Sequence, residues 1–193
     1  MTLPYNNIVD QREVQRWGKG CGRFPTSCVV RHLLVAANLL KPLGTLTVWD
    51  MTFGEGRFWV LIPQVRVIGW DIRKLKWYRL PFQFFKQPCW AWRYEEPSPH
   101  PDLVAIDPPW SRWQRGGRDR AHYWINKMEG TPEHILNYCG KAASEHFGVP
   151  LLVHYKDRWV PDGFRIVTEV WYQAVVRNMK MPKPSWFAIL EPE

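Results

Sequence analysis

Hydrophobic residues along this chain occur in two arrangements, short continuous runs and longer stretches with a helical period. The continuous runs are rich in β-branched and aromatic residues, which predicts buried strands. They cover residues 46–50, 65–71, 89–94, 104–106, 150–155, 164–176 and 185–190. The helical period predicts helices over residues 25–40 and 131–147, each opened by a proline next to a threonine. We also expect a short helix after Gly56, and a helix with a loop in residues 72–88. These elements favour an α/β fold whose last two strands form an antiparallel edge.

The strand at residues 104–106 runs directly into Asp107, Pro108, Pro109 and Trp110. The prolines end the strand because neither can donate a hydrogen bond to a neighbouring strand. Asp107 is therefore expected at the carboxyl tip of a core strand, the edge where open α/β sheets bind ligands. A strand end with a capping aspartate and a packed tryptophan would show the same pattern.

Two further acids follow earlier strands. Asp50 ends the strand at 46–50 and is followed at the fourth and sixth positions by Gly54 and Gly56, which predicts a tight strand-to-helix turn. The third glycine of a dinucleotide fingerprint is missing. Asp71 ends the next strand, where a carboxylate can accept both hydroxyls of a ribose.

These motifs resemble those of S-adenosylmethionine-dependent methyltransferases that modify exocyclic amino groups of bases, whose catalytic motif is (Asp/Asn/Ser)-Pro-Pro-(aromatic). The resemblance implies a Rossmann-like class I methyltransferase fold, with a mostly parallel seven-stranded sheet, an antiparallel C-terminal edge and helices on both faces. It also implies one methyltransferase domain over residues 25–193 and S-adenosylmethionine as cofactor. The expected cofactor-binding residues are Pro25, Thr26, Asp50, Met51, Thr52, Phe53, Gly54, Gly56, Asp71 and Ile72.

The resemblance assigns catalysis to the Asp-Pro-Pro-Trp segment. An exocyclic amino nitrogen is a poor nucleophile because its lone pair is delocalised into the ring. Asp107 is expected to accept one N–H of this group and the Pro108 carbonyl the other, stabilising the positive charge that develops on the nitrogen. Pro109 keeps that carbonyl rigid, and Trp110 offers a face on which the base stacks.

The charge of the chain suggests an anionic partner. Its formal net charge is +8, and thirteen tryptophans suit base stacking beside arginines. Basic and aromatic residues gather in residues 1–24 and in the loop after Trp110. The first region is either a substrate-binding arm or a solvated N-terminus; the second is either a loop that closes over a flipped nucleotide or an exposed loop without a role. The candidate RNA-binding residues are Arg16, Trp17, Lys19, Arg23, Arg112, Trp113, Arg115, Arg118 and Arg120.

The four cysteines, Cys21, Cys28, Cys89 and Cys139, show no zinc-binding spacing and no C-x-x-C pair, so we expect reduced, mostly buried thiols and no metal. The first residues lack a signal-peptide pattern, and no stretch has the roughly 20 apolar residues of a membrane helix. We therefore expect a cytoplasmic monomer.

The sequence thus predicts an RNA methyltransferase, with N4 of a ribosomal cytidine favoured and N6 of adenosine next. RNA is favoured over DNA because RNA loops already present unstacked bases, and because the chain lacks a separate region to read duplex DNA. A DNA methyltransferase and a non-catalytic nucleic-acid-binding subunit are the alternatives. The intact Asp107-to-Trp110 motif argues against the non-catalytic one.

Overall fold

The computed structural model describes residues 8–41, 44–71, 76–94, 96–108, 132–175 and 183–193. Its strands are β1 (Ile8–Asp10), β2 (Leu46–Asp50), β3 (Val65–Trp70), β4 (Gln83–Phe85), β5 (Leu103–Ile106), β6 (Leu151–Tyr155), β7 (Phe164–Gln173) and β8 (Ser185–Pro192). Its helices are α1 (Gln11–Arg16), α2 (Pro25–Ala36), η1 (Arg57–Trp59), η2 (Cys89–Arg93), α3 (Pro132–Ile135), η3 (Leu136–Lys141) and α4 (Ala142–Phe147).

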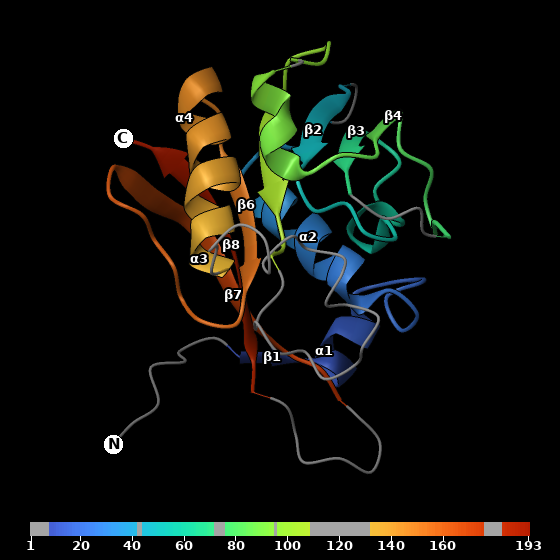
Figure 1. Ribbon diagram of the computed structural model, residues 1–193. Coiled ribbons are helices and arrows are strands. Elements are labelled where there is room, and N and C mark those ends of the chain that lie inside the picture. The colour runs from blue at the N-terminus through green and yellow to red at the C-terminus, as the bar shows by residue number, and fades with distance from the viewer. Residues whose placement is uncertain (1–7, 42–43, 72–75, 95, 109–131, 176–182) are drawn as a thin grey trace, which may run out of the picture.

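The strands form one sheet in the order β1-β7-β8-β6-β5-β2-β3-β4 (Figure 1). Every pairing is parallel except those of β8 with β6 and β7, so β8 runs against the other strands. Along the chain, the strands after β2 extend the sheet in one direction through β3 and β4, and in the other direction from β5. The sheet therefore reverses its order between β2 and β5, the position where open α/β sheets form a ligand-binding crevice.

Helices cover both faces of the sheet and bury two hydrophobic cores. Alternate residues of a strand point to opposite faces, so Val48 packs with α2 on one face while Trp49 packs with α3 and α4 on the other. The α/β class, the mostly parallel sheet and the antiparallel C-terminal pair are thus confirmed. The sheet has one strand more than predicted, because β1 pairs in parallel with the outer side of β7.

The prediction of a strand over residues 89–94 was wrong. Cys89–Arg93 forms the 3-10 helix η2, in which the Ala91 N–H bonds the Pro88 carbonyl and the Tyr94 N–H bonds the Ala91 carbonyl. Its buried residues, Cys89 and Trp92, lie three positions apart, which is the period of a 3-10 helix and not that of a strand. The strand of this region is β4, which lies in the segment predicted to hold a helix and a loop.

The helical stretch over residues 132–147 is one continuous helical segment with a π-helical centre, η3. Gly140 in that centre faces β5: a Cβ there would lie 3.0 Å from the Ile106 side chain. The close approach packs the helix directly against the strand that leads into Asp107.

Residues 8–24 are folded against the domain. Asp10 caps α1 by accepting the Glu13 N–H, and Val14 is completely buried. The glycine run at residues 18–22 forms a hydrogen-bonded turn in which the Phe24 N–H donates to the Gly20 carbonyl. Substrate binding by this region stays a prediction.

Candidate active site

Asp50 organises the loop at the end of β2. The side chain is 3% exposed. Its Oδ1 accepts the Thr52 N–H at 3.0 Å, and its Oδ2 accepts the indole N–H of Trp59 at 2.7 Å. The first bond closes the turn after the strand, and the second ties that turn to η1. Asp50 therefore fixes the path of residues 51–56 from inside the fold.

Burial dominates the titration of this carboxyl group. It raises the pKa of Asp50 from 3.8 to about 7, although the hydrogen bonds from Trp59 and Thr52 lower it. The nearby carboxylates of Asp107 and Asp71 raise it further. A carboxyl group in this position takes up a proton near neutral pH and favours a positively charged ligand beside it.

Phe53 packs between two glycines beneath the loop. A Cβ on Gly69 would lie 2.6 Å from the Phe53 side chain, and a Cβ on Gly56 would lie 2.7 Å from its ring. The ring also contacts Trp77 and Phe84, with centroids 6.3 and 6.2 Å away. Gly56 was expected to pack under a cofactor; in the structure it makes room for Phe53, and Gly54 is the loop glycine that lines the cavity.

Replacing Gly69 with alanine is expected to lower the free energy of unfolding by about 2 kcal/mol, because the new methyl group overlaps the Phe53 side chain. Thermal denaturation would show a fall in Tm of about 6 °C. Gly22→Ala is the matched control, since its Cβ would meet the nearest side-chain atom of Gln15 at 3.6 Å. The combination of Gly69→Ala with Phe53→Leu should cost less than the sum of the two single changes; simple additivity would contradict the overlap.

Asp71 directly follows β3 and is also buried. Its Oδ2 accepts the Gly54 N–H at 3.2 Å, and its own N–H donates to the Phe85 carbonyl. Asp71 thus holds the glycine loop in place. Its proposed contact with a ribose stays a prediction, and Ile72 lies outside the described residues.

Asp107 leaves β5 beside this loop. Its N–H donates to Thr52 Oγ1 at 2.6 Å, and its Oδ1 lies 3.0 Å from Nδ1 of His154. Pro108 is buried, and Pro109 and Trp110 lie outside the described residues. The sequence-predicted acids Asp50 and Asp107 are therefore brought together by the reversal of strand order between β2 and β5.

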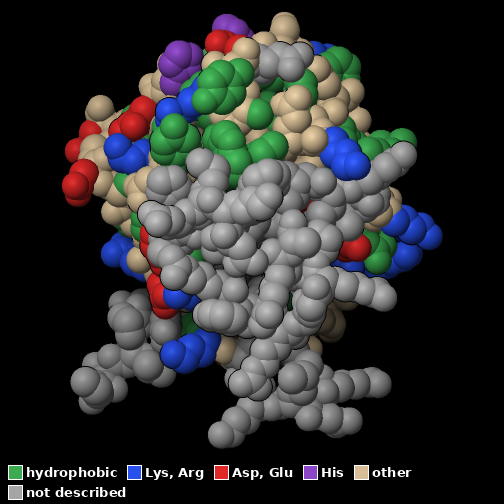
Figure 2. Space-filling view, in the orientation of Figure 1, with side chains coloured by type: hydrophobic (Ala, Val, Ile, Leu, Met, Phe, Trp, Pro, Cys, Tyr) green, Lys and Arg blue, Asp and Glu red, His purple; other side chains and the backbone are tan. Residues whose placement is uncertain are grey.

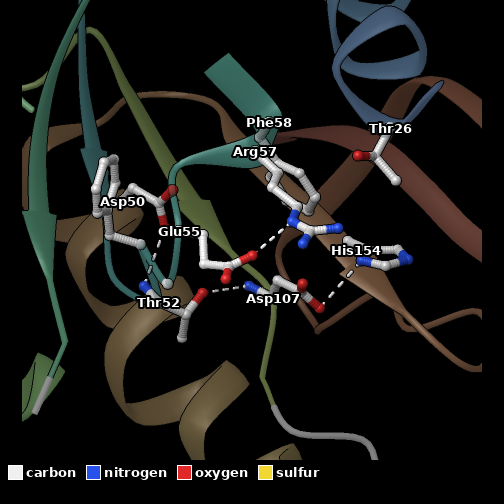
Figure 3. A pocket seen from close by; sticks show the side chains of 10 residues that line it. Thr26, Asp50, Thr52, Glu55, Arg57, Phe58, Asp107 and His154 are labelled. Carbon is white, nitrogen blue, oxygen red and sulfur yellow. Dashed lines mark hydrogen bonds and ion pairs between the residues drawn. The ribbon is translucent and has the colours of Figure 1, made fainter. Parts of the chain in front are cut away.

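These groups surround a cavity of about 380 Å³ (Figure 3). The predicted residues that line it are Thr26, Asp50, Thr52, Phe53, Gly54 and Asp107, and the others are Glu55, Arg57, Phe58 and His154. In Figure 3 the side chains of Glu55, Arg57, Asp107 and His154 converge, with Arg57 Nε 2.6 Å from Glu55 Oε2. Pro25 lies next to Thr26 at the start of α2, while Met51 packs into the core on the α3–α4 face.

No family model matches the sequence, and no curated protein sequence matches it. Solved methyltransferase structures do match the fold. TrmN from Thermus thermophilus has a TM-score of 0.52 and 15% identity over 89% of this chain and 52% of its own. This chain therefore spans about half the length of TrmN.

Two more matches extend over most of both chains. The rRNA methyltransferase aviRa from Streptomyces viridochromogenes has a TM-score of 0.50 and 14% identity over 86% of this chain and 83% of its own. The N-methyltransferase NodS from Bradyrhizobium japonicum has a TM-score of 0.51 and 11% identity over 91% of this chain and 98% of its own. The chain has the class I methyltransferase fold.

Four residues of the cavity in this methyltransferase fold were not predicted from the sequence: Glu55, Arg57, Phe58 and His154. Glu55 lies between the two loop glycines, and Arg57 and Phe58 belong to the short helix expected after them. Their position in the chain could have identified these three. His154 lies in an apolar strand, and no local signal marks it.

The expected RNA-binding residues fall in two groups. Arg16, Lys19 and Arg23 are exposed, and Trp17 stacks on His32 with ring centroids 4.8 Å apart. Arg112, Trp113, Arg115, Arg118 and Arg120 lie outside the described residues. RNA binding by either group stays a prediction.

The expectation of four reduced cysteines was wrong. Cys21 and Cys28 form a disulfide, with Cα atoms 5.6 Å apart, while Cys89 and Cys139 are buried free thiols. The turn that precedes α2 folds Cys21 back onto the first turn of that helix. The pairing thus depends on the turn, and a separation of seven residues matches no spacing rule that the sequence offers.

Within the described ranges, no cluster of three or more His, Cys, Asp or Glu side chains is placed to hold a metal ion. None of the helices in those ranges is long and apolar enough to cross a membrane.

Proposed function

We propose that this protein is an S-adenosylmethionine-dependent methyltransferase that modifies the exocyclic amino group of an unpaired base in RNA. N4 of a ribosomal cytidine is the favoured target, and N6 of adenosine is the next. The observation that carries this proposal is the position of Asp107, which opens into the same cavity as Asp50 and Gly54 at the reversal of strand order. A polar strand end and a glycine loop thereby face one ligand-sized space.

The charge of the cavity suits the cofactor. S-adenosylmethionine carries positive charge on its sulfonium and its α-ammonium group, and a negative α-carboxylate. Three carboxyl groups line the cavity, from Asp50, Glu55 and Asp107, together with the guanidinium of Arg57. We expect Asp50 to face the ammonium end and Arg57 to pair with the carboxylate, with Gly54 as the backbone contact.

The bound cofactor supplies an activated methyl group, so the chain needs chiefly to position the base. Asp107 accepts one N–H of the amino group, and the Pro108 carbonyl accepts the other. Both acceptors draw the nitrogen lone pair out of conjugation and stabilise the charge that develops there. The hydrogen bond from the Asp107 N–H to Thr52 links this acceptor to the cofactor loop. The loop that would hold the cofactor is therefore joined directly to the residue that would hold the base.

Local arginine and aromatic contacts support a nucleic-acid substrate better than an overall basic surface does. Among the described residues that Figure 2 shows, lysine and arginine side chains are scattered, with acidic side chains among them. At the cavity rim, the Arg57 guanidinium lies 4.8 Å from the centre of the Tyr78 ring, and Tyr78 contacts Phe24 edge-on. Arg23 in turn lies over Phe24. Such a row can stack unpaired bases and pair their phosphates.

Replacing Tyr78 with alanine should therefore weaken the binding of a single-stranded RNA by about tenfold, the loss of one base-stacking contact. Fluorescence anisotropy with a labelled oligonucleotide measures this. Tyr94→Ala is the control, because Tyr94 is 88% exposed but belongs to the segment leading into the amino end of β5. Equal losses in both variants would contradict a specific role for the rim.

The proposal is tested by incubating the purified full chain with methyl-labelled S-adenosylmethionine and, separately, ribosomal RNA, transfer RNA, single-stranded DNA and duplex DNA. Digestion to nucleosides and mass spectrometry should find the label on the amino group of cytidine or adenosine in RNA. Label in DNA alone would reject RNA as the substrate. Cofactor binding without any transfer would favour the non-catalytic alternative.

A further inference from the structure

We propose that His154 is a positioning residue that acts through Asp107: it orients the carboxylate and takes up the proton that methyl transfer releases. This inference rests on the proposed function, because it concerns the fate of a proton in that reaction. The structure supplies the geometry for it in a chain of contacts that runs from Asp107 through His154 and Ser185 to the backbone of β7.

The His154 ring has a polar neighbour at each nitrogen. Its Nδ1 lies 3.0 Å from Asp107 Oδ1, and its Nε2 lies 3.0 Å from Ser185 Oγ. The Ser185 hydroxyl donates its single hydrogen to the carbonyl of Tyr172. The Ser185 oxygen is then left to accept a hydrogen bond, and the donor is the Nε2–H of His154.

The position of the hydrogen on Nε2 determines which form of Nδ1 faces Asp107. In the neutral ring with hydrogen on Nε2, Nδ1 presents a lone pair to the carboxylate. In the protonated ring, Nδ1 donates to Asp107 and forms an ion pair with it. When a proton lies between these atoms, their 3.0 Å contact becomes a charge-assisted hydrogen bond. The neutral ring can therefore accept one proton from Asp107.

The ring is held in place by aromatic neighbours. It stacks on Phe187 with centroids 3.9 Å apart and an interplanar angle of 14°, and Phe58 meets it edge-on at 5.6 Å. His154 is 7% exposed. Because aromatic rings confine its faces and Nε2 is hydrogen-bonded to Ser185, the His154 ring keeps its Nδ1 directed toward Asp107.

Methyl transfer requires such an acceptor. A C–N bond forms as the C–S bond of the sulfonium breaks, which leaves a neutral thioether and a positively charged nitrogen. That nitrogen must lose one proton to give the neutral methylamino base. Asp107, which accepts its N–H, passes the proton to Nδ1 of His154. Asp107 is again a carboxylate, and His154 is an imidazolium until it exchanges its proton with solvent.

Titratable groups near the ring other than His154 also affect how the rate depends on pH. From β7, Tyr172 packs on the same cluster, and burial raises its pKa to about 12, above the range of the assay. The cavity also holds Asp50, Glu55 and Arg57. Of these, Asp50 titrates near neutral pH before a cation binds, so the rates are compared at saturating cofactor and RNA.

The test is the single-turnover rate as a function of pH for the wild type, His154→Gln and Ser185→Ala. Glutamine can donate to Asp107 and so preserves its orientation, but it cannot accept the proton. We expect His154→Gln to lower the rate by about a hundredfold and to remove the fall in rate at acidic pH that the wild type shows. Cofactor affinity should change less than twofold. Ser185→Ala should lower the rate but keep the acidic limb. A wild-type rate and pH profile in His154→Gln would overturn the proposal.

A second measurement needs no methyl acceptor. Nitrogen-15 NMR of the imidazole rings, assigned with His154→Gln, should find His154 with hydrogen on Nε2, and the chemical shift of its Nδ1 should change in Asp107→Asn. An unchanged Nδ1 shift would overturn the pairing. If the Nδ1 shift depends on Asp107 but the wild type methylates no nucleic acid, the proposed function and the catalytic use of the pair both fail, while the contact between His154 and Asp107 stands.

Discussion

Replacing Asp107 with asparagine is expected to slow methyl transfer by about a thousandfold while leaving cofactor affinity within a few-fold of the wild type. Asparagine has nearly the same volume, so the neighbouring β5 and loop can keep their packing. It lacks the negative charge that stabilises the developing cation on the base. It also ends the proposed proton relay to His154, whose Nδ1 lies 3.0 Å from Asp107 Oδ1.

The measurement compares single-turnover rates with the dissociation constant for S-adenosylmethionine from calorimetry. Asp102→Asn is the matched control: it lies at the other end of β5, where its Oδ2 accepts the Thr47 N–H at 2.7 Å. That variant should lose some stability and keep its rate at saturating substrate. A slow Asp107→Asn variant with equally weak cofactor binding would instead place Asp107 in the cofactor site.

The central half of the sheet was predictable because its strands are buried on both faces. Such strands are continuous apolar runs, and each of β2, β3 and β5 is followed or ended by an acid that cannot continue the run. The sequence pattern alone therefore predicts Asp50, Asp71 and Asp107 at one edge of the sheet. The glycines after Asp50 then predict the tight loop.

The features that were not predicted depend on contacts between distant segments. His154 joins the site because Val153 of β6 pairs with Ile106 at the end of β5. The residues that follow this pair, His154 and Asp107, therefore lie side by side. Nothing in an apolar strand reveals which strand it will pair with. Likewise β1 is only three residues long, and its place in the sheet comes from pairing with β7 near the other end of the chain.

The free energy of unfolding of the cofactor-free protein is expected to fall by about 4 kcal/mol between pH 4 and pH 7 through Asp50 alone. Burial raises the pKa of Asp50 from 3.8 in the unfolded chain to about 7 in the fold. Each unit of difference corresponds to about 1.4 kcal/mol. Between these values the folded state binds the additional proton, so raising the pH destabilises the fold. Below pH 4 and above pH 7 the contribution is constant.

Urea denaturation of the wild type and Asp50→Asn across this range isolates the effect. The variant should be the less stable at pH 4, because its amide group meets one of the two N–H donors from Trp59 and Thr52 without an acceptor. Its stability should then depend much less on pH than that of the wild type. Parallel curves for the two proteins would mean that Asp50 stays ionised in the fold.

The proposed position of Asp50 beside the cofactor couples the same proton to cofactor binding. A cation beside the buried carboxylate favours its ionised form, so binding of S-adenosylmethionine should expel a proton below pH 7. Affinity is then expected to rise by close to tenfold per pH unit up to pH 7 and to level off above it. Calorimetry in buffers with different ionisation enthalpies counts the released protons. Release by the wild type and none by Asp50→Asn would show that Asp50 faces the cationic end of the cofactor. Equal release by both would move that end to another carboxyl group of the cavity, Glu55 or Asp107.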